Sequence, residues 1–363
     1  MANAHLSPDG DPLEHAENLI AEGKALAAAE FLRAHLAAGR GGLLARLTLV
    51  RALCEANDLA AALEEAREAS SLNPGVALAA LALGEVLMRA GHLPVAIGEF
   101  QRALRLDPPS EDARFLLGCA WLEAGEADRA LEFFEQLVDR PGLAEKIATA
   151  KAIRTAPRSD AGYVRHLFDQ FSADYDARMR GQLGYAAPEI LRGLADLVMP
   201  GRQNLAVLDL GCGTGLAGEI FKPLSSRLDG VDLSPAMLEK ARARGIYHDL
   251  KVADLETALA TGGARYDLIL AADTLVYLGD LTRTFAGAFQ RLAPDGYFLF
   301  TVERNDGEGF ALGPKRRWCH SENYLREQAA SAGLDVAGLV AASPRMEANQ
   351  PIEGFAVALS RLA

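Results

Sequence analysis

Small and large apolar residues recur along the first part of the chain with a fixed period of 34 residues. Four alanines keep this spacing: Ala28, Ala62, Ala96 and Ala130. Five residues before each alanine stands a residue that tolerates a left-handed backbone: Gly23, Asn57, Gly91 or Gly125. Further columns keep the same period: Leu83-Gly84 and Leu117-Gly118, Phe100 and Phe134, Pro74 and Pro108. Several columns in one register indicate an internal repeat, which an ordinary alanine-rich bundle does not explain.

Each repeat is expected to fold as two antiparallel helices. Apolar positions at helical spacing on both sides of a Gly or Asn predict a helix, a tight turn and a second helix, and the alanine lets the two helices approach closely. We place the four units at residues 9–42, 43–76, 77–110 and 111–144, after an N-terminal tail at 1–8. The last two units match well, whereas the first two are irregular, with Val50 and Ala66 where Gly and Phe are expected.

The pattern changes after the repeats. Residues 145–160 are expected to form a capping helix, over 145–156, and a linker that begins at Pro157. Beyond it, short runs rich in β-branched and aromatic residues alternate with helical stretches. The expected strands are residues 205–210, 228–232, 250–253, 266–271 and 297–302. This alternation predicts an α/β domain over 161–363, with a parallel sheet covered by helices on both faces.

Composition and charge agree with two folded domains. The 363 residues are 50% hydrophobic and 24% charged, which excludes a largely disordered or collagen-like chain. Residues 1–150 carry 13 Lys/Arg and 23 Asp/Glu, a net charge of −10, whereas the remainder carries 24 and 26, a net charge of −2. An acidic surface repels phosphate, so we expect no nucleic-acid partner.

Cysteines and histidines show no ligand spacing. The four cysteines lie far apart and form no Cys-x-x-Cys pair, and the seven histidines do not pair at metal-ligand distances, so neither a disulfide framework nor a metal site is expected. No stretch reaches about 18 uninterrupted apolar residues, and the start of the chain lacks the basic and apolar regions of a signal peptide. We therefore expect a cytoplasmic protein with no membrane contact.

A glycine-rich loop directly follows the first expected strand. The segment reads Val207-Leu208-Asp209-Leu210-Gly211-Cys212-Gly213-Thr214-Gly215. Such a loop brings the backbone close to a ligand, although a tight strand-to-helix turn alone also requires glycine. In a nicotinamide-binding fingerprint the third glycine would fall at Leu216, but here it is Gly215. The spacing therefore disfavours a dinucleotide site.

Several features together resemble the class I S-adenosylmethionine-dependent methyltransferases. An acid lies two residues before the first glycine, the glycines follow as Gly-x-Gly-x-Gly, and Asp232 ends the next strand. Residues 252–255, 266–273 and 292–297 fall where that family places its third, fourth and fifth strands. The resemblance covers about residues 161–363. It implies a Rossmann-like domain with a mostly parallel seven-stranded sheet, S-adenosylmethionine as cofactor, and methyl transfer as the reaction.

The resemblance also implies which residues hold the cofactor. Asp209 and the backbone of Gly211–Gly215 would hold its methionine part; Cys212 belongs to this loop because a small side chain fits there, and we assign it no chemistry. Asp232 would accept hydrogen bonds from both ribose hydroxyls, which requires a carboxylate. All these positions fall at the carboxyl ends of strands, where open α/β sheets bind ligands.

The adenine is implied to lie farther along the same edge. Leu233 and Met237 would flank it, Asp254 and Leu255 would meet its edge, and Ala271 would lie beneath the cofactor. Two of these residues have a second explanation in the sequence. Asp254 also fits a helix cap, and Met237 also fits the hydrophobic core.

The segment at residues 163–176, which is rich in aromatics, resembles the amino-terminal lid of many small-molecule and quinone methyltransferases. Tyr175 is the expected cofactor contact in this segment. Phe168 and Phe171 are explained equally well as the buried stripe of an amphipathic helix.

Four residues are candidates for contact with the methyl acceptor: Asp273, Tyr277, Glu303 and His320. Capping or core packing explains each of them as well. A hydroxyl acceptor needs a general base, whereas a positioned amine or carboxylate attacks with little help. We therefore assign no catalytic base, and the catalytic residues stay unknown.

The repeats resemble the tetratricopeptide repeat, and the whole arrangement, with Arg345-x-Glu347 near its end, resembles a bacterial family of predicted methyltransferases that carry such repeats. Three functions follow. In the first, the chain is an enzyme that methylates a protein, peptide or carrier-bound acceptor recruited by the repeats. Alternatively, it methylates a small molecule and its repeats serve oligomerisation or assembly. The third is a non-catalytic interaction protein, which the intact Asp209, glycines and Asp232 disfavour.

Overall fold

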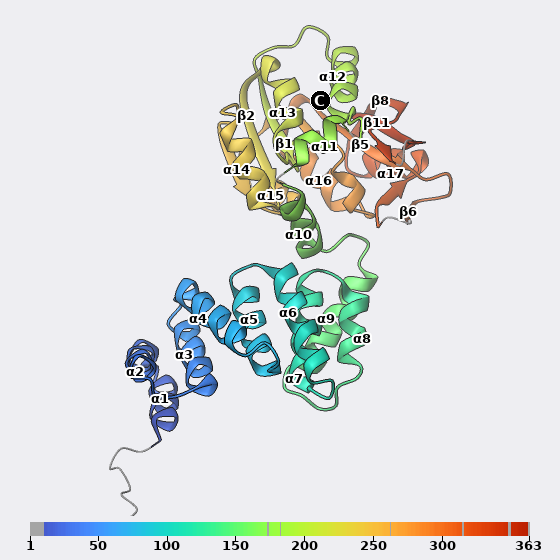
Figure 1. The fold of residues 1–363 in the computed structure, drawn as a ribbon. Helices are drawn as coiled ribbons and strands as arrows, with labels where there is room; N and C mark the ends of the chain where they lie inside the picture. The colour runs from blue at the N-terminus through green and yellow to red at the C-terminus, as the bar shows by residue number, and fades with distance from the viewer. Residues whose placement is uncertain are drawn as a thin grey trace, which may run out of the picture. The chain divides into compact units, whose positions relative to one another are not determined.

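The computed structural model describes residues 11–172, 174–181, 183–261, 263–313, 316–347 and 350–361, so the predicted tail at 1–8 lies outside the described residues. The chain divides into two compact units, of which the first ends at Arg154 and the second begins at Thr155 (Figure 1). Among the described residues, no helix combines the length and the apolar character that crossing a bilayer requires.

The first unit is a row of helices, of which the first eight pack in sequence, each against the next (Figure 1). In chain order they are α1 (Pro12–Ala21), α2 (Ala25–Ala37), α3 (Leu43–Glu55), α4 (Leu59–Leu72), α5 (Ala77–Arg89), α6 (Leu93–Leu106), α7 (Glu111–Glu123), α8 (Ala127–Phe134) and α9 (Leu143–Thr155). Each predicted repeat holds one helix pair, and α9 occupies the place of the capping helix. The helical-repeat half of the predicted fold is confirmed.

The turns within the repeats have the conformation that their residues favour. The backbone is left-handed, with φ values of 75°, 60°, 79° and 69°, at Gly23, Asn57, Gly91 and Gly125. This conformation ends the first helix of each pair and reverses the chain. The alanines five residues later are fully buried at Ala28, Ala62, Ala96 and Ala130. Their small size allows the close helix approach that the sequence predicts.

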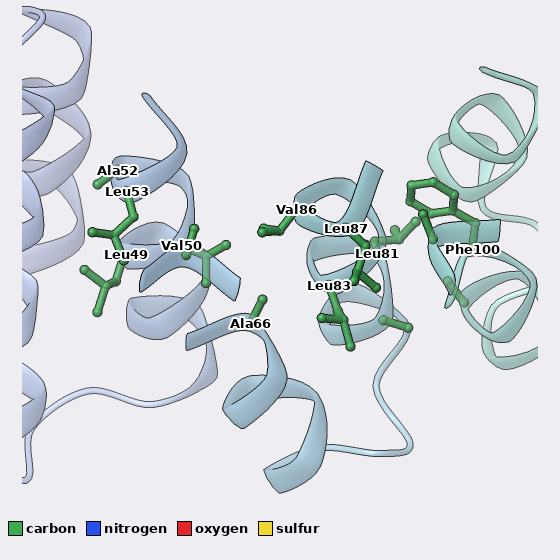
Figure 2. Close-up of a cluster of buried hydrophobic side chains, with 14 of the residues drawn as sticks. Leu49, Val50, Ala52, Leu53, Ala66, Leu81, Leu83, Val86, Leu87 and Phe100 are labelled. Carbon is green, nitrogen blue, oxygen red and sulfur yellow. The ribbon is translucent and has the colours of Figure 1, made fainter. Parts of the chain in front are cut away.

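A glycine and a phenylalanine fit together in the third and fourth repeats. A Cβ added at Gly84 would lie 2.5 Å from Cε1 of Phe100, and the fourth repeat has the same relation between Gly118 and Phe134. The second repeat carries Val50 and Ala66 at these two positions, and both are buried in the same core as Phe100 (Figure 2). In this repeat the larger residue of the pair lies on the first helix instead of the second, which explains why the repeat looks irregular.

The second unit contains a mostly parallel sheet, as predicted. Its strands follow the order β3 (Asp249–Val252), β2 (Ser225–Asp232), β1 (Leu205–Leu210), β4 (Tyr266–Ala271), β5 (Leu292–Arg304), β11 (Gly354–Arg361) and β8 (Leu334–Ala342). The first five are mutually parallel, whereas β11 is antiparallel to both of its neighbours. Two short strands, β6 (Phe310–Leu312) and β7 (Trp318–His320), extend the sheet beside β5, and β9 (Met346–Glu347) pairs separately with β10 (Gln350–Pro351).

The sheet has a hydrophobic core on each face. Successive residues of a strand point to opposite faces, and the two cores divide them accordingly: Phe298 and Phe300 lie in one and Leu299 in the other. The helices of this unit are α10 (Ala161–Phe171), α11 (Tyr175–Gly181), α12 (Ala187–Val198), α13 (Leu216–Phe221), α14 (Pro235–Ala243), α15 (Leu255–Thr261), α16 (Thr282–Arg291) and α17 (Glu322–Ser331). The α/β half of the predicted fold is confirmed.

Candidate functional site

A cavity lies at the carboxyl ends of the central strands. The strand order reverses direction between β1 and β4, the place where open α/β sheets bind ligands. Eight of the twelve predicted cofactor residues line this first cavity: Tyr175, Gly211, Cys212, Gly213, Asp232, Leu233, Asp254 and Leu255. The other four do not line it: Asp209, Gly215, Met237 and Ala271. The cavity is narrow, with a volume of about 80 Å³.

The glycine loop, residues 211–215, takes a conformation that few side chains tolerate. Gly211, Gly213 and Gly215 have φ values of 65°, 54° and 94°. A Cβ at Gly211 would lie 2.4 Å from Cγ2 of Thr274, so this glycine allows the loop to approach the segment after β4. A Cβ at Gly213 would meet no protein atom within 4 Å, so open space remains beside the loop.

Asp232 ends β2 and faces this loop. Its Oδ2 accepts a hydrogen bond of 2.8 Å from the Gly213 backbone N–H, and its Oδ1 accepts one of 2.8 Å from the Ser234 N–H. Burial raises the pKa of Asp232, while these two backbone donors act in the opposite direction. A carboxylate has about four acceptor positions, so each oxygen can still accept a further hydrogen bond.

Asp209 lies beneath the loop. Its side chain is 1% exposed, and its Oδ2 accepts a hydrogen bond of 2.7 Å from the hydroxyl of Tyr247. Oδ1 is buried without a hydrogen-bond partner among the described residues. Burial raises the pKa of Asp209 to about 7. The structure therefore places Asp209 as a support for the loop, one layer away from the cavity.

Tyr247 packs against three glycines, and the sequence analysis missed its role. An added Cβ would lie 3.0 Å from this ring at Gly215, 2.2 Å from its hydroxyl at Gly218 and 3.0 Å from its ring at Gly230. The missing side chain of Gly215 thus makes room for Tyr247. No local motif marks Tyr247, because it meets the loop only through the fold.

Asp254 has both of the roles that the sequence offers for it, a cavity contact and a helix cap. This residue lines the cavity. Its Oδ1 also accepts hydrogen bonds from the N–H groups of Glu256 at 3.0 Å and Thr257 at 3.2 Å, which caps the start of α15. Its Oδ2 forms an ion pair with Arg158 of the linker. Leu233 and Leu255 line the same end.

Met237 and Ala271 are both fully buried. Met237 is part of the interior of α14, where the structure matches its core explanation. Ala271 is the last residue of β4, and its neighbour Ala272 lines the cavity in its place. Both side chains therefore lie behind the surface that a ligand would touch.

Helices α10 and α11 cover the first cavity and are held by polar contacts, α11 to the glycine loop and α10 to the segment after β2. Asp176 forms an ion pair with Arg244 and accepts a hydrogen bond from the hydroxyl of Thr214. Ser234 donates a hydrogen bond to Asp169 of α10. The two helices thus form a lid, and we call the contacts of Asp176 with Arg244 and Thr214 the latch.

The aromatic residues of the lid divide between the cavity and the surface. Phe168 and Tyr175 line the first cavity, and their rings lie 6.1 Å apart in an edge-to-face arrangement. Burial raises the pKa of Tyr175. Phe171 is 37% exposed and packs beneath the guanidinium group of Arg178. Of the two phenylalanines, Phe168 therefore has the position of a ligand contact in this cavity.

A second cavity of about 430 Å³ adjoins the first. Four residues line both: Phe168, Tyr175, Asp273 and Tyr277. The second cavity also has an aromatic and aliphatic wall, made by Tyr163, Leu167, Phe171, Met179 and Leu183. Its charged lining residues are Arg178, Asp273, Arg317, Arg345 and Glu347. A molecule in this cavity would lie beside a ligand in the first.

Arg345 gathers the carboxylates around the second cavity. Its side chain is 1% exposed and forms ion pairs with Asp273, Glu303 and, at 3.0 Å, Glu347. Asp273 follows β4 in a left-handed conformation, with φ of 55°, and its N–H donates a hydrogen bond to the hydroxyl of Thr301 at 2.8 Å. Burial raises the pKa of Asp273, and the neighbouring arginines oppose that shift. The sequence analysis noted Arg345 only as part of a family pattern.

The four candidate acceptor residues have different positions. Asp273 and Tyr277 line both cavities, and burial raises the pKa of Tyr277 to about 12. Glu303 is bound to Arg345. His320 is fully buried, with its Nε2 3.0 Å from the carbonyl oxygen of Gly279, and burial lowers its pKa to about 4.

The linker before α10 also belongs to the site, which the sequence analysis did not predict. Arg158 and Ser159 line the first cavity. The Ser159 N–H donates to the carbonyl oxygen of Tyr277 at 2.8 Å, and the Pro157 carbonyl accepts from Gly279 at 2.9 Å. In the part of the chain that the structure describes, no three His, Cys, Asp or Glu residues form a group that could hold a metal ion.

Comparisons with known proteins assign both units to families. Residues 208–298 match the model of a methyltransferase domain, and residues 47–111 and 86–144 match that of a tetratricopeptide repeat. The chain is 35% identical to methyltransferase-like protein 27 of Homo sapiens over 136 residues, which cover 37% of this chain and 54% of that protein.

Two bacterial relatives are also similar to part of the chain. Identity is 26% over 165 residues with the ubiquinone biosynthesis O-methyltransferase of Methylobacterium sp., covering 42% of this chain and 66% of that protein. It is 32% over 143 residues with the malonyl-[acyl-carrier protein] O-methyltransferase of Salmonella typhimurium, covering 38% and 55%. The chain thus spans between a half and two thirds of the length of these relatives. Its second unit contains a methyltransferase domain, and tetratricopeptide repeats precede that domain in the same chain.

Proposed function

We propose that the chain transfers the methyl group of S-adenosylmethionine to an acceptor bound in the second cavity. The observation that carries this proposal is the contact between the glycine loop and Asp232. The Gly213 N–H donates a hydrogen bond of 2.8 Å to Asp232. This bond keeps a carboxylate that can accept hydrogen bonds from ribose hydroxyls beside an open stretch of backbone, and both line one cavity.

The residues present fit this cofactor. Asp232 retains acceptor capacity on both oxygens for the two ribose hydroxyls, and the glycine loop leaves open space beside Gly213 for the methionine part. Leu233 and Leu255 provide apolar contact for the adenine, with Asp254 at its edge. Asp209 acts through Tyr247 in this proposal, as a residue that positions the loop.

When bound, the cofactor would supply a methyl group on a sulfonium: the acceptor atom bonds to the methyl carbon while the carbon–sulfur bond breaks, and the electron pair of that bond stays on sulfur. The chain's residues align the acceptor and exclude water. Phe168 and Tyr175 of the lid close over both cavities. Tyr277, with a pKa of about 12, stays protonated at neutral pH and can donate a hydrogen bond to the acceptor. An acceptor that is already ionised needs no proton removed before it attacks.

The repeats are proposed to recruit a protein, peptide or carrier-bound acceptor. Their inner surface has a groove of about 380 Å³ with apolar residues such as Leu78, Leu81 and Phe115. The name of the Salmonella relative describes a carrier-bound substrate, which agrees with this proposal. The alternative is a small-molecule acceptor, with the repeats serving oligomerisation or assembly; the name of the Methylobacterium relative describes such an enzyme.

The experiment that tests the function has two steps. Calorimetry measures whether the full chain binds S-adenosylmethionine and S-adenosylhomocysteine, and absence of both would refute methyl transfer and leave an interaction protein. A cell lysate is then incubated with the chain and tritium-methyl-labelled cofactor and separated by size. Label in macromolecules supports recruitment of a protein or carrier, whereas label in small molecules supports the alternative.

A further inference from the structure

We propose that the second cavity binds a carboxylate-bearing acceptor and that Arg317 receives the carboxylate. This inference rests on the proposed function, since it specifies the acceptor of that reaction. The second cavity has a hydrogen-bond donor without an acceptor in its wall. Nη1 of Arg317 is buried without a hydrogen-bond partner among the described residues, and Arg317 lines the second cavity.

The nearby carboxylates leave Nη1 of this guanidinium group without a close hydrogen bond. Nη1 lies 3.5 Å from Oδ2 of Asp273 and 3.9 Å from Oε1 of Glu303. A charge-assisted hydrogen bond is shorter, at about 2.7 to 2.9 Å. Both carboxylates instead make their close contacts with Arg345, which also holds Glu347. Arg345 thus takes the close contacts of all three acids, and Nη1 of Arg317 keeps a donor that another anion can accept.

Arg317 also has a fixed position relative to the first cavity. Its guanidinium carbon lies 5.6 Å from the ring centre of Tyr277, which lines both cavities. A backbone hydrogen bond also holds this residue, because the Gly313 N–H donates to the Arg317 carbonyl at 2.7 Å. An anionic group on Arg317 would therefore lie in the second cavity, beside the wall shared with the first.

The rest of the cavity selects the body of the acceptor. Tyr163, Phe168 and Phe171 line it together with aliphatic residues, so an aromatic or aliphatic group fits there. A guanidinium group binds a carboxylate through two parallel hydrogen bonds, and it binds a phosphate in a similar way. We commit to the carboxylate, and the phosphate becomes an arm of the test.

The test compares three phenyl-bearing probes on the full chain saturated with S-adenosylhomocysteine: 3-phenylpropanoate and 3-phenylpropanamide, which share one shape, and phenyl phosphate. Calorimetry should show that the parent chain binds the acid about 10- to 100-fold more tightly than the amide. Arg317→Gln should abolish that preference, and Arg317→Lys should retain part of it. Arg326→Gln removes a half-exposed arginine of α17 and should keep the full preference.

Each contrary outcome has a distinct meaning. The proposal is overturned if the parent chain does not prefer the acid, including the case in which it binds neither probe, or if Arg317→Gln keeps the preference. Tighter binding of phenyl phosphate would reassign the site to phosphorylated acceptors. Weaker binding of S-adenosylhomocysteine by Arg317→Gln would assign Arg317 to the cofactor instead. If the parent chain binds no S-adenosylhomocysteine, the proposed function fails, and the acid–amide comparison without cofactor still decides the role of Arg317.

Discussion

The side chain of Asp232 offers the most direct test of the cofactor site. Asp232→Ala removes the acceptor for two ribose hydroxyls and frees the Gly213 N–H. We expect a loss of about 2 to 3 kcal/mol in binding of S-adenosylhomocysteine, or about 30- to 150-fold in affinity by calorimetry. Asp249→Ala, which removes a half-exposed aspartate at the start of β3, is the matched control and should bind normally. Unchanged affinity in Asp232→Ala would remove this residue from the site.

The pair formed by Gly84 and Phe100 predicts a compensating double substitution. Gly84→Val alone forces a side chain against the ring and should cost about 1 to 3 kcal/mol of stability. Phe100→Ala alone opens a cavity and should cost about 3 to 5 kcal/mol. The double variant copies Val50 and Ala66 of the second repeat and should lose clearly less than the sum of the two single changes.

Urea unfolding followed by the fluorescence of Trp121, in chains that carry Trp318→Phe, reports on the repeat unit. Additive losses in the double variant would show that the two positions do not compensate, and that the second repeat reaches its packing in another way.

His320 makes the stability of the second unit depend on pH. Its pKa is about 4 in the folded chain and near 6.5 when unfolded, so the unfolded state binds more protons between these values. The free energy of unfolding should fall as the pH is lowered from 6.5 to 4, by about 2 to 3 kcal/mol. Asp209, with its pKa raised to about 7, acts in the opposite direction. The measurement is therefore the difference between the parent chain and His320→Gln, which should lack this fall; identical pH curves would contradict it.

At the scale of elements, the latch on the lid predicts a change in cofactor exchange. The first cavity, at about 80 Å³, is smaller than the roughly 300 Å³ of typical ligand sites, so the lid must move for a ligand to enter. Asp176→Asn removes the charge that pairs with Arg244. We expect faster hydrogen exchange in α10 and α11 and dissociation of S-adenosylhomocysteine several-fold faster in stopped-flow measurements.

Arg192→Gln is the control, because Arg192 pairs with Asp196 four residues along α12, away from the lid. This variant should exchange its ligand at the parent rate. Equal rates in all three chains would show that the latch does not limit exchange.

The sequence predicted those elements whose boundaries are set locally. Strands β1 and β4 have the predicted limits, 205–210 and 266–271, because polar or glycine residues end each apolar run. Strand β5 is longer than predicted, since the strand begins at Leu292 and continues past the turn at Asp295, where φ is 58°. The individual strands β8 and β11 were not predicted. The alanines of β8 and its internal Gly338 give it only a weak strand pattern.

The difference between local and long-range determinants also explains which residues of the site could be predicted. The glycine loop and Asp232 were visible because one strand and its following turn carry them. Tyr247, Arg158 and Arg317 were missed because each reaches the site across many residues of chain: Arg158 pairs with Asp254, which lies 96 residues away. No local spacing records such contacts, so only the fold reveals them.

At the scale of the whole molecule, the residue at which a fragment begins should decide whether the second unit binds the cofactor on its own. Residues 155–363 contain every residue assigned to the cofactor and form their own compact unit. We expect this fragment to fold and to bind S-adenosylhomocysteine as the full chain does. A fragment starting at residue 161 loses Arg158, Ser159 and the carbonyl of Pro157, which bind Asp254, Tyr277 and Gly279.

The shorter fragment should therefore bind at least about tenfold more weakly by calorimetry. Equal affinity of the two fragments would contradict a role for the linker. Equal turnover of the longer fragment and the full chain on the natural acceptor would refute recruitment by the repeats.

The wall that the two cavities share would determine the order of events in the proposed methyl transfer. Phe168 and Tyr175 belong to the lid and line both cavities, so an acceptor bound in the second cavity would keep the lid closed over the first. The methyl donor must then enter before the acceptor, and the methylated product must leave before the spent donor. Steady-state kinetics should show compulsory-order addition, with S-adenosylhomocysteine competing with the donor and inhibiting non-competitively against the acceptor. The lid would thus set the timing of turnover as well as cover the site.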